Sequence, residues 1–199
     1  MTLRVLTCRG TEVADWCDAV AGLRIEVFRQ FPYLYDGDAG YEKRYLTTYA
    51  QSANSLLVVA LAGDHVVGAS TGLPLSEAAS AFREPFSDQG IALDDVFYCG
   101  ESLVIPAFRG QGLGHRFFDE RERHARTLGK KWSAFVSVDR AEDDPRRPPD
   151  YRSNEPFWQR RGYAPQHHMK VRLPWKQVGE ARETEQTLTM WLHALEVDS

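Results

Sequence analysis

The sequence predicts an α/β protein built on a mixed sheet that is flanked by helices. Three observations lead to this prediction. Short runs rich in β-branched and aromatic residues alternate with longer runs whose apolar residues recur every three or four positions. The tetrapeptide Ala62-Gly63-Asp64-His65 separates two of the β-rich runs and is a hairpin signal. The stretch 96–114 passes from a strand pattern, through a glycine-rich loop, to a helix pattern.

The β-rich runs predict the strands. The hairpin joins the second run to the third, and Pro106 ends the fourth. Two runs, 96–105 and 132–138, are apolar enough to be central or buried strands. The expected strands cover residues 3–7, 55–61, 66–74, 96–105, 132–138 and 168–173.

Helical periodicity predicts the helices between and after these strands. In the first of them, Trp16, Val20, Leu23 and Val27 are spaced three or four residues apart, as on one face of a helix. Gly129 ends a later helix as a C-terminal glycine cap. The expected helices cover residues 13–28, 41–49, 77–86, 112–128, 157–161 and 180–196.

The C-terminal third contains a predicted loop and a predicted last helix. Residues 139–153 are charged and rich in proline, which excludes regular structure, so we expect a mobile loop beside the site. The last helix, 180–196, carries an apolar stripe that suits the core or a contact between two subunits, and a homodimer is therefore one expectation. The stripe consists of Leu188, Trp191, Leu192 and Leu195.

Composition limits the class of protein. With 199 residues, 43% of them hydrophobic, the chain 1–199 should form a single domain with its own core. The formal net charge of −4 argues against a nucleic-acid partner. Neither a membrane-spanning run nor the apolar stretch of a signal peptide is evident, so we expect a cytoplasmic protein with no membrane partner. Cys8, Cys17 and Cys99 show neither pairing nor metal-ligand spacing, and we expect no metal.

The glycine-rich loop, residues 109–114, is the most informative segment. Glycines let the main chain turn tightly and approach a ligand without a Cβ in the way. The first N–H groups of the helix that follows lack internal partners and lie at the positive end of its dipole, which suits a diphosphate. Arg109 adds positive charge, or braces the loop with its side chain.

Three kinds of glycine-rich loop bind anionic ligands, and their sequence requirements differ. A Walker A loop needs Lys followed by Ser or Thr, whereas Gly114 precedes His115-Arg116. A dinucleotide fingerprint needs G-x-G-x-x-G directly after a strand, whereas these glycines are spaced G-x-G-x-G, after an intervening 106–108. The sequence Arg109-x-x-Gly112-x-Gly114, preceded by Pro106 and an apolar strand, resembles the acyl-CoA-binding motif of the Gcn5-related acetyltransferases, the GNAT family.

This resemblance, which spans about residues 96–163, implies a fold, a co-substrate and contacts. It implies a mostly antiparallel sheet of six to seven strands, with a splayed centre and a bulged central strand. It implies acetyl-CoA as co-substrate, held by main-chain groups of the central strand, by the glycine loop and by an asparagine. The implied contacts are Ser102, Leu103, Val104, Arg109, Gly110, Gln111, Gly112, Leu113, Gly114, His115 and Asn154.

The resemblance also implies catalytic residues. Glu101 lies where related enzymes place a carboxylate facing the amine, so it is predicted to be the general base or a substrate anchor, with Tyr98 as the second candidate. The family's proton-donating tyrosine is replaced by Trp158, whose indole cannot supply that proton. Tyr151, or water, is then left as the general acid.

The acceptor is predicted to be the primary amine of a small molecule. Tyr33, Tyr35 and Asp36 lie in an aromatic and acidic loop that suits a cationic group. Three alternatives stay open: acetylation of a protein or peptide, a non-catalytic acyl-CoA sensor or interaction module, and a protein that binds ATP or NAD through the same loop.

Overall fold

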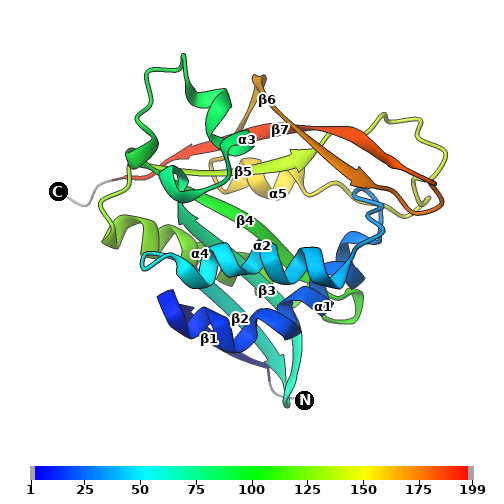
Figure 1. Cartoon of the computed structure of the whole chain (residues 1–199), viewed down its shortest axis with the longest axis horizontal. Helices are drawn as coiled ribbons and strands as arrows, with labels where there is room; N and C mark the ends of the chain where they lie inside the picture. Colours follow the sequence, from blue (N-terminus) through cyan, green and yellow to red (C-terminus); the bar gives the residue numbers. More distant parts are fainter. Residues whose placement is uncertain (1–2, 197–199) are drawn as a thin grey trace.

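A seven-stranded sheet runs through the computed structural model, which describes residues 3–196 (Figure 1). The strand order is β1-β2-β3-β4-β5-β7-β6, in which β4 and β5 are parallel and every other pair is antiparallel. The sheet confirms the predicted fold class. Its strands are β1 (Leu3–Arg9), β2 (Leu56–Ala62), β3 (His65–Pro74), β4 (Val96–Val104), β5 (Trp132–Val138), β6 (Ala164–Lys176) and β7 (Glu183–Ala194).

Helices cover both faces of this sheet. The α-helices are α1 (Cys17–Phe28), α2 (Ala39–Gln51), α3 (Ser80–Arg83), α4 (Leu113–Thr127) and α5 (Glu155–Arg160). The 3-10 helices are η1 (Gly10–Trp16), η2 (Leu75–Glu77), η3 (Glu84–Phe86), η4 (Leu93–Asp95) and η5 (Pro106–Phe108). The predicted helix 77–86 is therefore only one α-helical turn between two 3-10 turns, because Ala78 is extended and Pro85 cannot continue the α-helical hydrogen bonds.

Strand β2 separates two hydrophobic cores, since successive side chains of a strand point to opposite faces. Leu57 and Val59 lie in the core that α1 and α2 cover. Val58 and Ala60 lie in the core that α4 covers, into which α5 also packs. Figure 1 shows α1 and α2 on one side of the strands and α4 on the other.

The sheet is open at its centre. Pairing between β4 and β5 is confined to Val96–Tyr98 and Trp132–Ala134. Beyond Tyr98, β4 continues against β3 alone, and beyond Ala134, β5 continues against β7 alone. The register of β3 against β4 also shifts. Thr71 pairs with Glu101 and Leu73 pairs with Tyr98, so β4 has one residue more than β3 between these pairs, which is a β-bulge. The splayed centre and the bulged central strand are confirmed.

The predicted C-terminal helix is wrong: these residues form β7, between β5 and β6. Apolar residues spaced three or four apart also fit a strand that is buried on both faces. Leu188 and Leu192 lie in the core under α1 and α2, whereas Trp191 and Leu195 lie in the core under α4. All four are buried, so the stripe offers no surface to a second subunit.

Residues 139–153 contain neither helix nor strand, as predicted. Arg140 donates to the carbonyl oxygens of Pro32 and Tyr33, at 2.6 and 3.0 Å, and Arg146 donates to Gln177. These bonds hold the segment against the 31–36 loop and the end of β6. Its mobility stays a prediction. Within residues 3–196, no helix is both long and apolar enough to cross a bilayer.

Candidate functional site

The glycine loop between β4 and α4 forms an open cradle of main-chain N–H groups. Gly110 and Gly112 have φ values of +75° and +82°, in the left-handed region that favours glycine. A Cβ at either position would meet nothing within 4 Å. Within the described chain, the N–H groups of residues 110–115 have no acceptor. The cradle fits an anionic group at the positive end of the 15-residue helix α4.

Arg109 braces this loop. Its Nε donates to the carbonyl oxygen of Val104, at the end of β4, at 3.0 Å. Its Nη2 donates to Oε1 of Gln30, just beyond α1, also at 3.0 Å. Of the two roles open to Arg109 in the sequence, the structure therefore favours the bracing one.

The other predicted cofactor contacts are distributed around the opening of the sheet. Ser102 is exposed, Val104 is half-buried, and Leu103 and Leu113 are buried in the cores. Exposed His115 places its ring 4.9 Å from that of Phe157 on α5. The remaining predicted contacts belong to the start of α4 and the start of α5. They are Gln111 and Gly114 in the glycine loop and Asn154, the residue just before α5.

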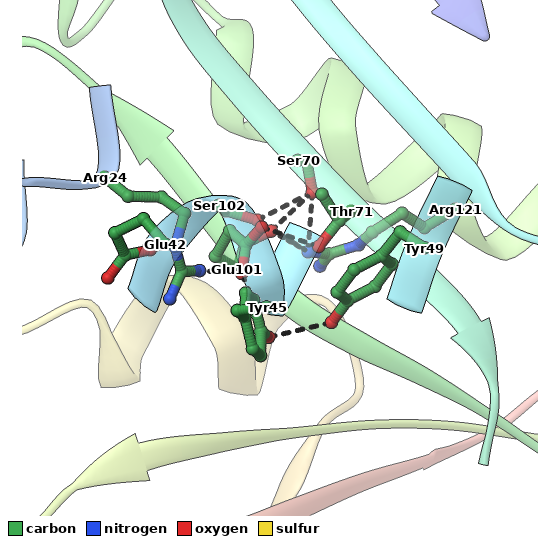
Figure 2. Close-up of polar contacts among 9 residues, drawn as sticks. All are labelled: Arg24, Glu42, Tyr45, Tyr49, Ser70, Thr71, Glu101, Ser102 and Arg121. Atoms are coloured by element: carbon green, nitrogen blue, oxygen red, sulfur yellow. Dashed lines mark hydrogen bonds and ion pairs between the residues drawn. The ribbon is translucent and has the colours of Figure 1, made fainter. Parts of the chain in front are cut away.

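Glu101 lies in a buried ion cluster on the α1–α2 face of β4. Arg24, on α1, donates to two carboxylates, through Nε to Glu42 of α2 and through Nη1 to Glu101 (Figure 2). The side chains of both glutamates are 0% exposed. Burial alone would lower the pKa of Arg24, but the adjoining carboxylates raise it well above its usual value. We call these three residues the Arg24 cluster.

Hydroxyl groups surround the Arg24 cluster. Thr71 of β3 donates to Oε1 of Glu101 at 2.8 Å. The phenol of Tyr45 lies 3.4 Å from Oε2 of Glu101 and 2.8 Å from the phenol of Tyr49. Figure 2 shows the two phenols pointing toward each other. The guanidinium of Arg24 also stacks on the Tyr45 ring, 4.2 Å from its centroid.

Gly100 makes this arrangement possible. A Cβ there would overlap the Tyr49 hydroxyl and lie 2.8 and 2.9 Å from the hydroxyls of Thr71 and Tyr45. The mid-strand glycine therefore serves a close approach of the chain's own side chains.

A second buried arginine contacts β4 from the other face of the sheet. Arg121, on α4, is 2% exposed, and its Nη1 donates to the hydroxyls of Ser70 and Ser102, at 3.0 and 2.5 Å. The same nitrogen lies 3.5 Å from the main-chain oxygen of Glu101. These polar contacts reduce the cost of burying the Arg121 guanidinium.

Tyr98 and Tyr151, the other predicted catalytic residues, lie in different places. Tyr98 is 1% exposed and stacks on Phe82, at 4.6 Å between centroids. Tyr151 is half-buried, and its ring packs edge-on against Phe31 at 4.7 Å. Burial raises the pKa of both phenols, which keeps them protonated at neutral pH.

Trp158 is part of an aromatic cluster beneath α5. Its ring lies 5.0 Å from that of Phe135 and 5.1 Å from that of Trp191. The indole packs against the core at the position where the resemblance expected a tyrosine.

The 31–36 loop, predicted to bind the acceptor, lies beside the Arg24 cluster. Burial raises the pKa of Tyr33 to about 12, and Arg24 opposes the rise. Burial and the neighbouring carboxylate of Glu42 raise the pKa of Tyr35. Asp36 is paired with Lys176 and Arg29, at 2.9 and 2.8 Å, and these bonds lower its pKa. The structure thus brings Tyr33 and Tyr35 to the site and engages Asp36 elsewhere.

Sequence reasoning did not predict the ion pair of Arg24 with Glu101, the phenol pair of Tyr45 and Tyr49, or the place of Arg121. One signal was available. Arg24 follows Val20 by four residues, on the buried stripe of α1, where a charged side chain needs a buried partner. The partner, Glu101, lies 77 residues further along the chain.

Neither a protein-family model nor a curated protein sequence matches this chain. Solved structures do match it over its full length. A Salmonella typhimurium protein, described as a candidate acetyltransferase and crystallised with its cofactor acetyl-CoA, is 14% identical with a TM-score of 0.60, covering 100% of this chain and 97% of its own. The ribosomal-protein-alanine N-acetyltransferase of Brucella melitensis is 13% identical with a TM-score of 0.60, covering 96% and 99%.

A third match, an N-acetyltransferase from Staphylococcus aureus Mu50, is 10% identical with a TM-score of 0.60, covering 98% of this chain and 100% of its own. A candidate acetyltransferase of the GNAT family from Desulfovibrio desulfuricans and an acetyltransferase of the GNAT family from Streptococcus pneumoniae match as well, so the chain has the fold of the Gcn5-related acetyltransferases. In this chain, the glycine loop, the bulge of β4 and the Arg24 cluster all border the opening between β4 and β5. Among the described residues, no group of three or more His, Cys, Asp or Glu is placed to hold a metal ion.

Proposed function

We propose that the protein is a GNAT-type enzyme that transfers an acetyl group from acetyl-CoA to the primary amine of a small molecule, by direct attack in a ternary complex. One observation carries the proposal: the open centre of the sheet lies in continuity with the N–H cradle of the glycine loop. An extended ligand can pair with the free edge of β4 while its diphosphate occupies the cradle. The GNAT fold of the whole chain supports the same assignment.

Acetyl-CoA, when bound, supplies the activated acyl group. The main-chain groups of Ser102, Leu103 and Val104 would hold the thioester and pantetheine arm along the unpaired edge of β4. The cradle would take the diphosphate through the N–H groups of residues 110–115. A main-chain N–H of the bulged strand would stabilise the negative charge that develops on the carbonyl oxygen.

The acceptor would enter from the α1–α2 side. Tyr33 and Tyr35 supply aromatic faces there, and the Arg24 cluster carries one more negative than positive charge. This arrangement favours an amine that arrives as a cation, loses one proton to water and gives its next proton to Glu101 as it attacks. Binding holds the amine next to the thioester, and loss of the first proton frees the nitrogen lone pair for attack.

We also place the enzyme in the cytoplasm. Cys8, Cys17 and Cys99 are all free cysteines, which suits a reducing compartment. The sequence gives no reason for nucleic-acid or membrane partners, and a homodimer would need a surface other than the buried C-terminal stripe.

Calorimetry tests the cofactor first. Acetyl-CoA, ATP and NAD are titrated into the wild type, into Gly112→Trp, which fills the cradle, and into Gly129→Trp. Gly129 is the matched control, because it also has a left-handed φ (+68°) and open space around it, but lies at the other end of α4. The proposal expects micromolar binding of acetyl-CoA alone, lost only in Gly112→Trp. Equal binding of ATP would instead favour a nucleotide-binding protein.

A screen for release of CoA then tests the acceptor. It includes small primary amines, and also peptides with an N-terminal alanine, because one similar structure is a ribosomal-protein-alanine N-acetyltransferase. Turnover with peptides alone would replace the small-molecule acceptor by a protein. Tight binding of acetyl-CoA with no turnover in the whole screen would favour the non-catalytic sensor, which Trp158 already makes the second candidate.

A further inference from the structure

The proposed reaction needs a proton for the departing thiolate, and the donor expected from the family pattern is missing. Trp158 lies among Phe135 and Trp191 and has no acidic proton to give. Tyr151 packs on Phe31, and the guanidinium of Arg147 lies 5.4 Å from its ring. Neither residue is joined by a hydrogen bond to the Arg24 cluster.

Tyr45 has the contacts that a donor needs. It projects from α2 toward Gly100, in the bulge where β4 has separated from β5. Its phenol oxygen is within 3.4 Å of Glu101 and 2.8 Å of the Tyr49 phenol. Tyr45 is only partly buried, whereas Tyr49 behind it is 2% exposed. Of the two residues, Tyr45 therefore has the more exposed side chain.

We propose that Tyr45 is the proton donor to the leaving thiolate and that Glu101 and Tyr45 form a proton relay. This inference rests on the proposed function. The acceptor, a neutral amine that has already lost one proton to water, forms a bond from its nitrogen to the carbonyl carbon and gives a second proton to Glu101. The C–S bond breaks, its electron pair remains on sulfur, and the sulfur takes the proton of the Tyr45 hydroxyl. The proton on Glu101 then passes to Tyr45, so that both side chains return to their initial state.

The Arg24 cluster is able to hold that proton. Arg24, Glu42 and Glu101 together carry one net negative charge, and a proton on Glu101 makes the cluster neutral. Arg24 would still have Glu42 as its counter-ion, so no buried charge would lose its partner. Arg121, across the strand, bonds to hydroxyls and lies near a main-chain oxygen, and it makes no ion pair with either carboxylate.

The relay is also favourable in free energy. Burial, followed by the effects of Tyr49 and Glu101, raises the pKa of Tyr45 well above its usual value, although Arg24 opposes this rise. The phenol is therefore protonated before the reaction. Over the whole cycle the proton moves from a carboxylic acid to a thiolate, which is ordinarily the stronger base.

The test compares leaving groups in the variant Tyr45→Phe, which keeps the ring over Arg24 and removes only the hydroxyl. Tyr41→Phe is the control, because Tyr41 lies one turn earlier on α2 and is 52% exposed. With acetyl-CoA, Tyr45→Phe should lose about 100-fold or more in kcat, the usual size of general acid catalysis. Its calorimetric affinity for acetyl-CoA should stay within a few-fold of the wild type.

A second acetyl donor, the thioester of 4-nitrothiophenol, releases an acidic thiol that leaves without taking up a proton. Wild type and Tyr45→Phe should then turn over at rates within a few-fold of each other. If Tyr45→Phe loses the same factor in kcat with both thioesters, or loses nothing with acetyl-CoA, the role of Tyr45 is overturned while the proposed function stays intact. A wild type that binds acetyl-CoA but acetylates no acceptor would overturn the proposed function itself.

Discussion

The candidate site depends on the absence of a Cβ at Gly100. The hydroxyls of Tyr45, Tyr49 and Thr71 all converge on the space that a Cβ would occupy. At this position glycine is required by a close approach of side chains, and not by a positive φ.

Gly100→Ala should therefore destabilise the fold by about 1–3 kcal/mol, because the buried side chains would have to move. It should also abolish turnover by displacing Tyr45. Gly22→Ala is the control: Gly22 lies inside α1 with nothing within 4 Å of a Cβ, so this change should be neutral or stabilising. Urea denaturation of both variants measures the difference, and equal stabilities would contradict the packing described for Gly100.

His124, on α4, gives the molecule a dependence of stability on pH. Its Nε2 donates to the Asn54 carbonyl at 2.9 Å, and burial lowers its pKa, although this bond opposes the shift. The folded chain then takes up the proton less readily than the unfolded chain, in which the pKa is about 6.5. Neutral His124 therefore contributes to the free energy of unfolding in full above pH about 6.5, and this contribution is lost as the pH falls below that value.

Urea midpoints at about pH 7.5 and pH 5 test this dependence. The decrease on acidification should be smaller in His124→Gln than in the wild type. His167→Gln, which alters an exposed histidine, should keep the wild-type decrease. A His124→Gln variant with an unchanged decrease would show that other groups cause it.

At the scale of elements, the loop between β4 and α4 depends on Arg109. This side chain ties the loop to Val104 and to Gln30, and it therefore orders the N–H groups of the cradle. Because two bonds in different directions are needed, a lysine cannot replace the planar guanidinium.

Arg109→Ala should weaken the binding of acetyl-CoA by about tenfold, which corresponds to about 1.4 kcal/mol. Arg109→Lys should show nearly the same loss, although it keeps the charge. Gln30→Ala, which removes one of the two acceptors, should show a smaller loss. Calorimetry decides the point: full affinity in Arg109→Lys would mean that the charge acts on the ligand directly.

The elements also show which features the sequence could predict. Strand β5, at 132–138, and the tight glycine loop at 109–114 were predicted from local patterns, because their signals lie within a few residues. β7 was not, because apolar residues on both faces of a buried strand imitate helical spacing. The pairing of Arg24 with Glu101 was out of reach for a different reason: it joins residues 77 positions apart, and only the folded sheet brings them together.

At the scale of the whole molecule, one sheet divides two cores that have few residues in common. Val58 and Val59, neighbours on β2, are both 0% exposed and point into opposite cores. A cavity in one core is therefore expected to lower the free energy of unfolding by an amount that does not depend on the other core. The shared sheet should keep unfolding cooperative.

Val58→Ala and Val59→Ala should each cost roughly 1–3 kcal/mol of unfolding free energy. The double variant should cost the sum of the two, to within about 0.5 kcal/mol, in a single transition. Denaturation followed by both fluorescence and circular dichroism tests this. Two separate transitions, or a strong departure from the sum, would mean that the cores are coupled differently.

The separation of β4 from β5 gives this sheet two inner edges, in addition to its outer edges at β1 and β6. Main-chain groups at an unpaired edge are a template for a strand from another chain, and proteins that keep such edges must protect them. A ligand lying along β4 would act as a missing strand and cover the template. Occupancy of the site would therefore keep copies of the chain apart, and the unliganded form would be the one at risk of self-association.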